Sequence, residues 1–70
     1  MNEAWRFNFS RNLSQYITNR GCTLSDFADE VGVTTSALSN YIHYRRVPSV
    51  TVLIKIADVL GCSLDDLIRF

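Results

Sequence analysis

Two short helical patterns meet at residues 31–33 of this chain, with almost no room for a loop between them. Before the junction, apolar residues recur at the i, i+3, i+4, i+7 spacing of one helix face: Leu24, Phe27, Ala28 and Val31. After it the same rule resumes with Ala37, Leu38 and Tyr41. Gly32 tolerates a positive φ, and Thr34 or Thr35 can cap the second helix. The sequence therefore predicts two helices that cross at a steep angle over roughly residues 23–43.

The outer face of the second helix is polar in an unusual way. It carries Thr35, Ser36, Ser39, Asn40 and His43. These side chains donate and accept hydrogen bonds, and none of them is acidic. An ordinary solvated face usually carries Glu and Lys in i,i+4 pairs, and this face has neither. The pattern favours a helix-turn-helix that reads DNA over a plain polar surface.

The size and composition of the chain predict one folded domain over residues 1–70. A chain of 70 residues can close a single small core. It is 47% hydrophobic, has one proline and shows no low-complexity stretch, which argues against disorder. No apolar run approaches the roughly 18 residues that span a bilayer, and residues 1–10 lack a signal-peptide pattern. We therefore expect a cytoplasmic protein with no membrane partner.

Charge is distributed unevenly although the formal net charge is zero. Residues 31–57 contain no Asp or Glu, whereas Arg45, Arg46 and Lys55 lie in this span. The acidic residues lie before and after it. One side of the molecule is therefore expected to be locally basic, as a polyanion-binding surface requires.

The reactive side chains favour neither a metal site nor an enzyme. Cys22 and Cys62 follow no CxxC pattern, and a single histidine leaves a zinc site short of ligands. We expect both cysteines to be reduced packing residues. His43 has no paired carboxylate or nucleophile nearby in the sequence, so we expect no catalysis. No cofactor, metal or small-molecule ligand is indicated.

The flanking segments complete an all-α domain. A first helix is predicted from the helical spacing of Trp5, Phe9, Leu13, Tyr16 and Ile17. A strongly apolar helix is predicted from Ser49 to Leu60, after Pro48, and Ser63 caps a last short helix. The C-terminal segment supplies more apolar surface than so small a core requires, which makes part of it a candidate dimer face.

The chain resembles the phage-repressor and Cro-like (XRE-type) helix-turn-helix family. The resemblance is ungapped over roughly residues 9–68. Its most specific parts are Arg20-Gly21-Cys22-Thr23, Leu24-Ser25-Asp26-Phe27-Ala28, Val31-Gly32-Val33-Thr34, Ala37-Leu38-Ser39-Asn40, Pro48-Ser49 and Ala57 through Leu67. Each piece alone is weak, but their order and spacing together are specific. The resemblance implies a compact five-helix domain like that of lambda repressor.

The resemblance also implies which residues touch DNA. Thr35, Ser36 and Asn40, with Ser39 as an addition, match positions that read bases in the major groove. The implied phosphate-binding residues are Thr23, Thr34, His43, Tyr44, Arg45 and Arg46. The implied function is that of a sequence-specific regulator of transcription, most readily a repressor that binds a near-palindromic operator as a homodimer. Leu67, Ile68 and Phe70 are the expected dimer contacts, with burial in the core as their alternative role.

The chain departs from the family pattern in three respects, and the third involves a pair of residues. Leu24 replaces a glutamine that often contacts phosphate. Tyr44 stands where a glycine is common, so the loop is expected to take another course and offer its phenol to DNA or packing. Ile17 and Ile42 replace an Arg–Glu ion pair. Because apolar replacement of a buried ion pair is often neutral or stabilising, we expect the two isoleucines to touch and join the core.

Other functions remain alternatives. The same fold serves as a protein-interaction module, such as an antitoxin or adaptor, and an exposed apolar patch around Trp5, Phe7 or Phe70 would mark that role. RNA is a weaker candidate, because the A-form major groove does not admit a recognition helix. A small complete regulator and the N-terminal domain of a longer repressor both fit the sequence.

Overall fold

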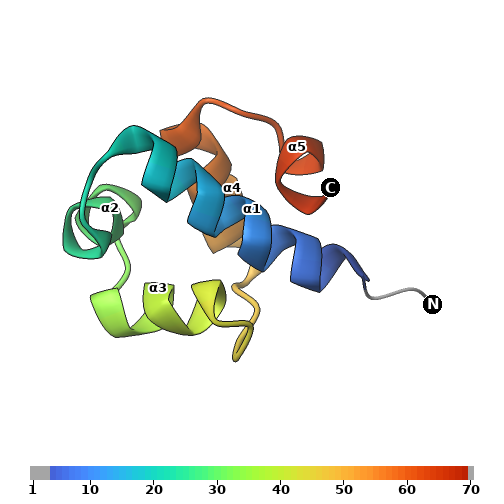
Figure 1. Cartoon of the computed structure of the whole chain (residues 1–70), viewed down its shortest axis with the longest axis horizontal. Coiled ribbons are helices and arrows are strands. Elements are labelled where there is room, and N and C mark those ends of the chain that lie inside the picture. The colour runs from blue at the N-terminus through green and yellow to red at the C-terminus, as the bar shows by residue number, and fades with distance from the viewer. Residues whose placement is uncertain (1–3, 70) are drawn as a thin grey trace.

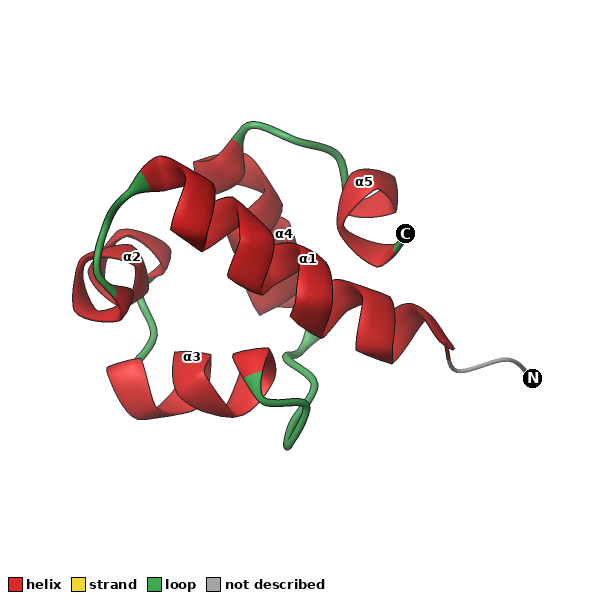
Figure 2. Cartoon of the chain, viewed as in Figure 1, coloured by secondary structure: helices red, strands yellow, loops and turns green. Residues whose placement is uncertain are grey.

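The computed structural model describes residues 4–69, and these form five α-helices joined by short connections (Figure 1, Figure 2). In chain order the helices are α1 (Ala4–Arg20), α2 (Leu24–Val31), α3 (Thr35–Ile42), α4 (Val50–Leu60) and α5 (Leu64–Ile68). The predicted all-α fold is confirmed. None of the helices described is long and apolar enough to cross a membrane.

A hydroxyl side chain caps the start of every helix from α2 to α5. Thr23, Thr34, Ser49 and Ser63 each accept a hydrogen bond from the backbone N–H three residues further along. Thr34 rather than Thr35 is thus the cap of α3. Gly32 ends α2 with φ of 87°, a left-handed conformation that costs glycine little. This glycine lets the chain turn at once from α2 into α3.

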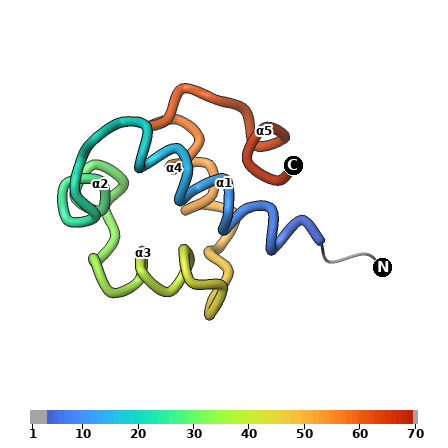
Figure 3. The backbone as a smooth tube through the Cα atoms, viewed as in Figure 1, coloured from blue at the N-terminus to red at the C-terminus, as the bar shows by residue number. Residues whose placement is uncertain are grey.

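The core lies where α1, α2 and α4 converge, and α3 and α5 cover it. Its fully buried large side chains are Phe9, Leu13, Phe27, Leu38, Ile56 and Leu67. The helix α1 packs against both α3 and α5, while α2 packs against α3 and α4. The backbone trace in Figure 3 shows α3 along the lower edge of the molecule, with α1 running above it in the view and in front of α4. This packing fixes the inner face of α3 and leaves its outer face to solvent.

The two isoleucines that replace an ion pair both belong to the apolar interior. Ile17 is 5% exposed and lies in the core cluster, and Ile42 is half-buried and packs against that cluster. Their expected place in the core is confirmed, and their direct contact stays a prediction.

Amide side chains of α1 hold α5 in place. Asn12 donates to the carbonyl of Leu67 at 2.9 Å and also to that of Arg69, while Asn8 donates to Ile68 at 3.3 Å. These carbonyls belong to the last turn of a helix and have no partner within it. The side chains of α1 therefore dock α5 by satisfying its C-terminal end.

Part of the expected dimer surface was wrong. Leu67 is fully buried because it fastens α5 to the core, so its side chain cannot meet a partner. Ile68 is half-buried against the same core, and Phe70 lies outside the described residues. The exposed apolar surface lies instead on α4, where Val50 is 68% and Ile54 is 46% exposed.

Candidate nucleic-acid interface

The polar face predicted for residues 35–43 lies on the outside of α3. Thr35 and Ser36 are exposed in its first turn, and Ser39 and Asn40 are half-exposed one turn later. In Figure 1, α3 runs along the edge of the molecule opposite α5. The four residues expected to read bases therefore share one accessible helix face, and Leu38 anchors the opposite face in the core.

The N-terminal ends of α2 and α3 suit phosphate. The Thr34 hydroxyl oxygen accepts from the Ala37 N–H at 3.0 Å, and that of Thr23 accepts from the Asp26 N–H at 3.1 Å. Each hydroxyl keeps its own hydrogen for donation. The first N–H groups of a helix also lie at its positive end, where they bind anions. Leu24 packs against the core, so the polar side chains at the start of α2 are Thr23, Ser25 and the carboxylate of Asp26.

The C-terminal end of α3 is closed by a Schellman motif. The Arg45 N–H donates to the Asn40 carbonyl at 2.9 Å, and the Tyr44 N–H donates to the Tyr41 carbonyl at 3.3 Å. A buried serine of α1, Ser10, donates its hydroxyl to that same Tyr41 carbonyl at 2.7 Å. The loop expected to grip phosphate is therefore hydrogen-bonded to α3, and the end of α3 is hydrogen-bonded to α1.

Tyr44 occupies the left-handed position of this motif, with φ of 62°. The expectation that the loop would take another course was wrong, because tyrosine adopts the backbone conformation that usually selects glycine. A left-handed residue with a Cβ costs about 1–2 kcal/mol. The ring of Tyr44 meets that of Phe7 edge to face, with centroids 6.0 Å apart, and the Arg6 guanidinium lies 5.7 Å from its centroid. An edge-to-face pair contributes about 0.5–1.5 kcal/mol, which offsets much of this strain.

Asn40 and Arg45 are linked to each other. The Arg45 guanidinium donates to the Asn40 side-chain oxygen over 3.4 Å. This long hydrogen bond leaves the Asn40 NH₂ group able to donate to a base. Arg45 is therefore able to orient the amide as well as to meet phosphate.

His43 caps α3 through its ring. Its Nδ1 lies 2.8 Å from the Ser39 carbonyl oxygen, and since a carbonyl can only accept, Nδ1 carries the hydrogen. The Nε2 atom is then the ring nitrogen left for an outside partner. The exposed side chains of Arg45 and Arg46 follow directly in the chain.

Carboxylates are absent from α3 and from the loop at residues 43–48 that follows it. Asp26, Asp29 and Glu30 are exposed on α2, and Glu30 pairs with Arg20 at 3.0 Å. Arg69 pairs with Asp65 in the C-terminal segment. The predicted separation of charge is therefore preserved in the fold, with the basic residues beside α3.

Sequence reasoning missed two residues behind the interface. Ser10 shares helical spacing with Leu13 and Ile17, so a polar group on that buried stripe was the available signal. Phe7 falls off the stripe defined by Phe9, and that misfit was the signal of a separate role. Trp5, by contrast, is half-buried and packs against the core, so only Phe7 is a large exposed aromatic of α1.

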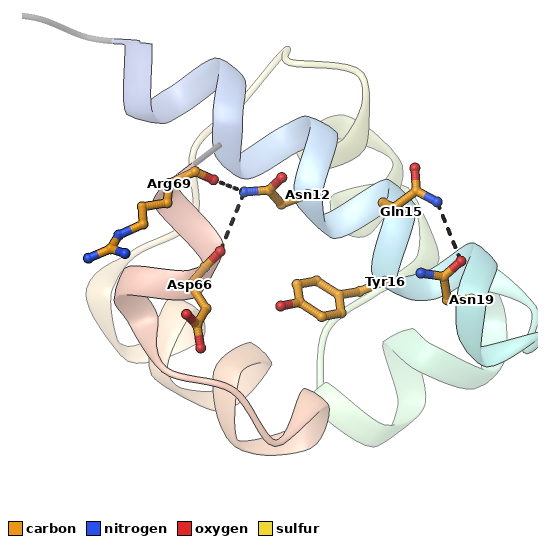
Figure 4. Close-up of a pocket in the computed structure, with 6 residues that line it drawn as sticks. All are labelled: Asn12, Gln15, Tyr16, Asn19, Asp66 and Arg69. Atoms are coloured by element: carbon orange, nitrogen blue, oxygen red, sulfur yellow. Dashed lines mark hydrogen bonds between the residues drawn. The ribbon is translucent and has the colours of Figure 1, made fainter.

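A polar hollow lies on another side of the molecule, between α1 and α5 (Figure 4). It has a volume of about 330 Å³ and is lined by Asn12, Gln15, Tyr16, Asn19, Asp66 and Arg69. Burial raises the pKa of Tyr16, and the adjoining Cys62 thiol raises it further. Burial also raises the pKa of Cys62 itself. Within residues 4–69 no three His, Cys, Asp or Glu side chains gather as metal ligands would.

The fold and the exposed polar helix together define a helix-turn-helix DNA-binding domain. A family model described as Helix-turn-helix matches residues 13–67. The chain belongs to this family, and the resemblance noted from its sequence is confirmed.

A curated relative and a solved structure are similar to this chain. The chain is 34% identical over 61 residues to a protein described as an uncharacterized HTH-type transcriptional regulator, YqaE, of Bacillus subtilis (strain 168). The alignment covers 87% of this chain and 53% of that protein, so the chain spans about half the length of its relative. The solution structure of the SOS-response transcriptional repressor LexA from Eubacterium rectale superposes with a TM-score of 0.89. That match covers 99% of this chain and 73% of the other at 23% identity, which supports the fold.

Proposed function

We propose that the chain is a sequence-specific repressor that binds duplex DNA by placing α3 in the major groove. The observation that carries this proposal is the acid-free, hydrogen-bonding face formed by Thr35, Ser36, Ser39 and Asn40. Bases present donors and acceptors in the major groove, and Asn can bind adenine through two hydrogen bonds. The Thr35 methyl group would meet a thymine methyl in this arrangement.

Phosphate contacts on both sides of α3 would set its position in the groove. Thr23 and Thr34 lie at helix N-terminal ends, and His43, Tyr44, Arg45 and Arg46 form the loop that follows α3. Such contacts determine register and affinity, whereas base contacts determine sequence preference.

A homodimer on a near-palindromic operator is part of the proposal. Two copies related by a two-fold axis would place their α3 helices about 34 Å apart, one turn of DNA. The exposed apolar strip of α4, formed by Val50 and Ile54, is the surface that we assign to pairing. Ile68 can extend this surface only through its exposed part.

Selection from a random duplex library at two salt concentrations tests the proposal. We expect an enriched inverted repeat with half-sites about one turn apart, bound more weakly at high salt. A single half-site would contradict the dimer but retain sequence reading. If the folded chain enriches no sequence, the proposed function is wrong, and a change of Trp5 fluorescence with added proteins would then test the interaction-module alternative.

A further inference from the structure

We propose that Phe7 is a positioning residue for DNA binding, because it braces Tyr44 in the left-handed conformation that shapes the loop after α3. Only the expected effect of Phe7 on DNA binding rests on the proposed function. The brace itself is a property of the free protein.

The first step is the strain at Tyr44. Its φ of 62° is one that residues with a Cβ adopt rarely. Glycine would reach it without cost, whereas tyrosine needs contacts that exist only in this conformation. The hydrogen bonds of the motif alone do not explain why an aromatic residue is held there, since they are made by backbone atoms.

The second step is the place of Phe7. It is 55% exposed, and its spacing from Phe9 puts it off the buried stripe of α1. Its ring stands at 78° to that of Tyr44, with centroids 6.0 Å apart, and Arg6 approaches the same tyrosine ring. The first turns of α1 thus reach across to the end of α3. A residue this exposed contributes little to the core, so its contact with Tyr44 is its main structural role.

The third step is what the left-handed turn controls. It brings the N–H groups of Arg45 and Arg46 onto one carbonyl, that of Asn40, at 2.9 and 3.3 Å. It also places the Arg45 guanidinium on the Asn40 side chain. Loss of the turn would release two basic residues and the amide expected to read adenine. The brace therefore acts on both affinity and sequence preference through residues that Phe7 does not touch.

The test uses four variants of the full chain: Phe7→Ala, Phe7→Tyr, Tyr44→Gly and the double variant Phe7→Ala with Tyr44→Gly. The matched control is Leu64→Ala, which truncates an exposed apolar side chain on α5. One readout is amide hydrogen exchange of Arg45 and Arg46 without DNA. The other is the dissociation constant for a selected operator duplex.

Phe7→Ala should speed exchange of both amides and weaken operator binding about three- to tenfold, the effect of losing a contact that offsets one strained residue. Phe7→Tyr should resemble the wild type, because it keeps the ring. Tyr44→Gly should keep the turn, and in its background Phe7→Ala should have almost no further effect. Leu64→Ala should leave the exchange of both amides unchanged.

Two results would overturn the brace. One is unchanged amide exchange in Phe7→Ala. The other is an equal loss from Phe7→Ala in the wild-type and Tyr44→Gly backgrounds, which would mean that Phe7 acts without Tyr44. If the wild type binds no duplex, the proposed function fails, but the exchange of the four variants still decides whether the brace exists.

Discussion

The side chain of Asn40 contacts Arg45, a residue outside its own helix. Its side-chain oxygen accepts from Arg45, and its backbone carbonyl accepts from the next two amides of the loop. A base-reading side chain that is already oriented loses less freedom on binding. The structure therefore links two residues, Asn40 and Arg45, to which the proposal gives separate roles in base reading and phosphate binding.

Asn40→Ala should relax preference at one base pair of the operator, by about 1–3 kcal/mol of discrimination. Binding to operators that differ by single bases would measure it. Arg45→Ala should weaken binding to all sequences and reduce the salt dependence by about one ion. Because Arg45 also orients Asn40, we expect a smaller loss of preference at that same base pair.

Arg46→Ala is the matched control for the second change, since Arg46 is the adjacent exposed cation. It should reduce the salt dependence without altering base preference. Equal, sequence-independent losses in Asn40→Ala and Arg45→Ala would contradict the roles assigned to them.

Cys62 makes stability sensitive to alkaline pH. Burial raises the pKa of its thiol above the ordinary value of 9.0, so the unfolded chain gives up this proton more readily than the folded one. The contribution of the protonated Cys62 thiol to the free energy of unfolding is fully present below pH 9.0, and it is lost as the pH rises through the pKa of the folded state. Urea unfolding of the reduced protein should show this fall, and Cys62→Ala should show a smaller one. An equal fall in the stability of both proteins would mean that Cys62 does not cause it.

At the scale of elements, α1 does more than cover the core. It donates the Ser10 hydroxyl to the end of α3 and two amide side chains to the end of α5. Each contact satisfies carbonyls that a helix cannot pair by itself. The orientation of α3 therefore depends on α1 as well as on the turn that precedes α3.

Ser10→Ala should lower the free energy of unfolding by about 0.5–1.5 kcal/mol, the net value of a hydrogen bond. Urea unfolding would measure it. Ser14→Ala, a similar change on the same helix at a less buried position, is the control and should cost less. A larger loss from Ser14→Ala would contradict the role given to Ser10.

Ile17 and Ile42 should show coupling in a double-mutant cycle. Each Ile→Val change removes one methyl group and should cost about 0.5–1.5 kcal/mol where the side chain is buried. If the two side chains touch, the double variant should deviate from the sum by at least about 0.5 kcal/mol. The same cycle between Ile17 and the exposed Ile54 is the control. Additive effects in the first cycle would exclude direct contact.

Local patterns were enough to predict most elements. Helical spacing gave α2 and α3, and Ser49, Ser63 and Gly32 fixed ends because capping and left-handed turns act over three or four residues. The burial of Leu67 could not be predicted from such local patterns. Its burial depends on α5 reaching back to α1, and that contact is not encoded in the spacing of neighbours.

At the scale of the whole molecule, the described surface includes an apolar strip on α4 that does not pack against the core. Val50 and Ile54 lie one turn apart on this helix and are both exposed. Exposed apolar patches commonly mark contact surfaces. The pairing surface is therefore expected on α4 and not at Leu67.

Ile54→Gln should weaken self-association about tenfold or more, because it places a polar side chain in an apolar contact. Sedimentation analysis over a range of protein concentrations would measure the change. Lys55→Gln alters the adjacent exposed residue and is the control. If both variants associate like the wild type, the strip is not the dimer surface.

The candidate interface was predictable as a set of residues but not as a working arrangement. The pattern of α3 indicated which side chains face outward, because the inner face is set by Leu38 and its apolar neighbours. The sequence could not reveal that Arg45 holds Asn40, or that Phe7 meets Tyr44 from a helix 37 positions away in the chain. Such contacts depend on the packing of α1 across α3.

The hydrogen bonds from Asn8 and Asn12 to residues 66–69 have a consequence for how the protein is made. A ribosome releases α1 first and α5 last, so the face of α1 that receives α5 stays uncovered until nearly all of this segment has emerged. Nascent chains that end before Leu67 should therefore be the preferred targets of chaperones and proteases. Completion of this fold therefore waits until residues 66–69 have emerged.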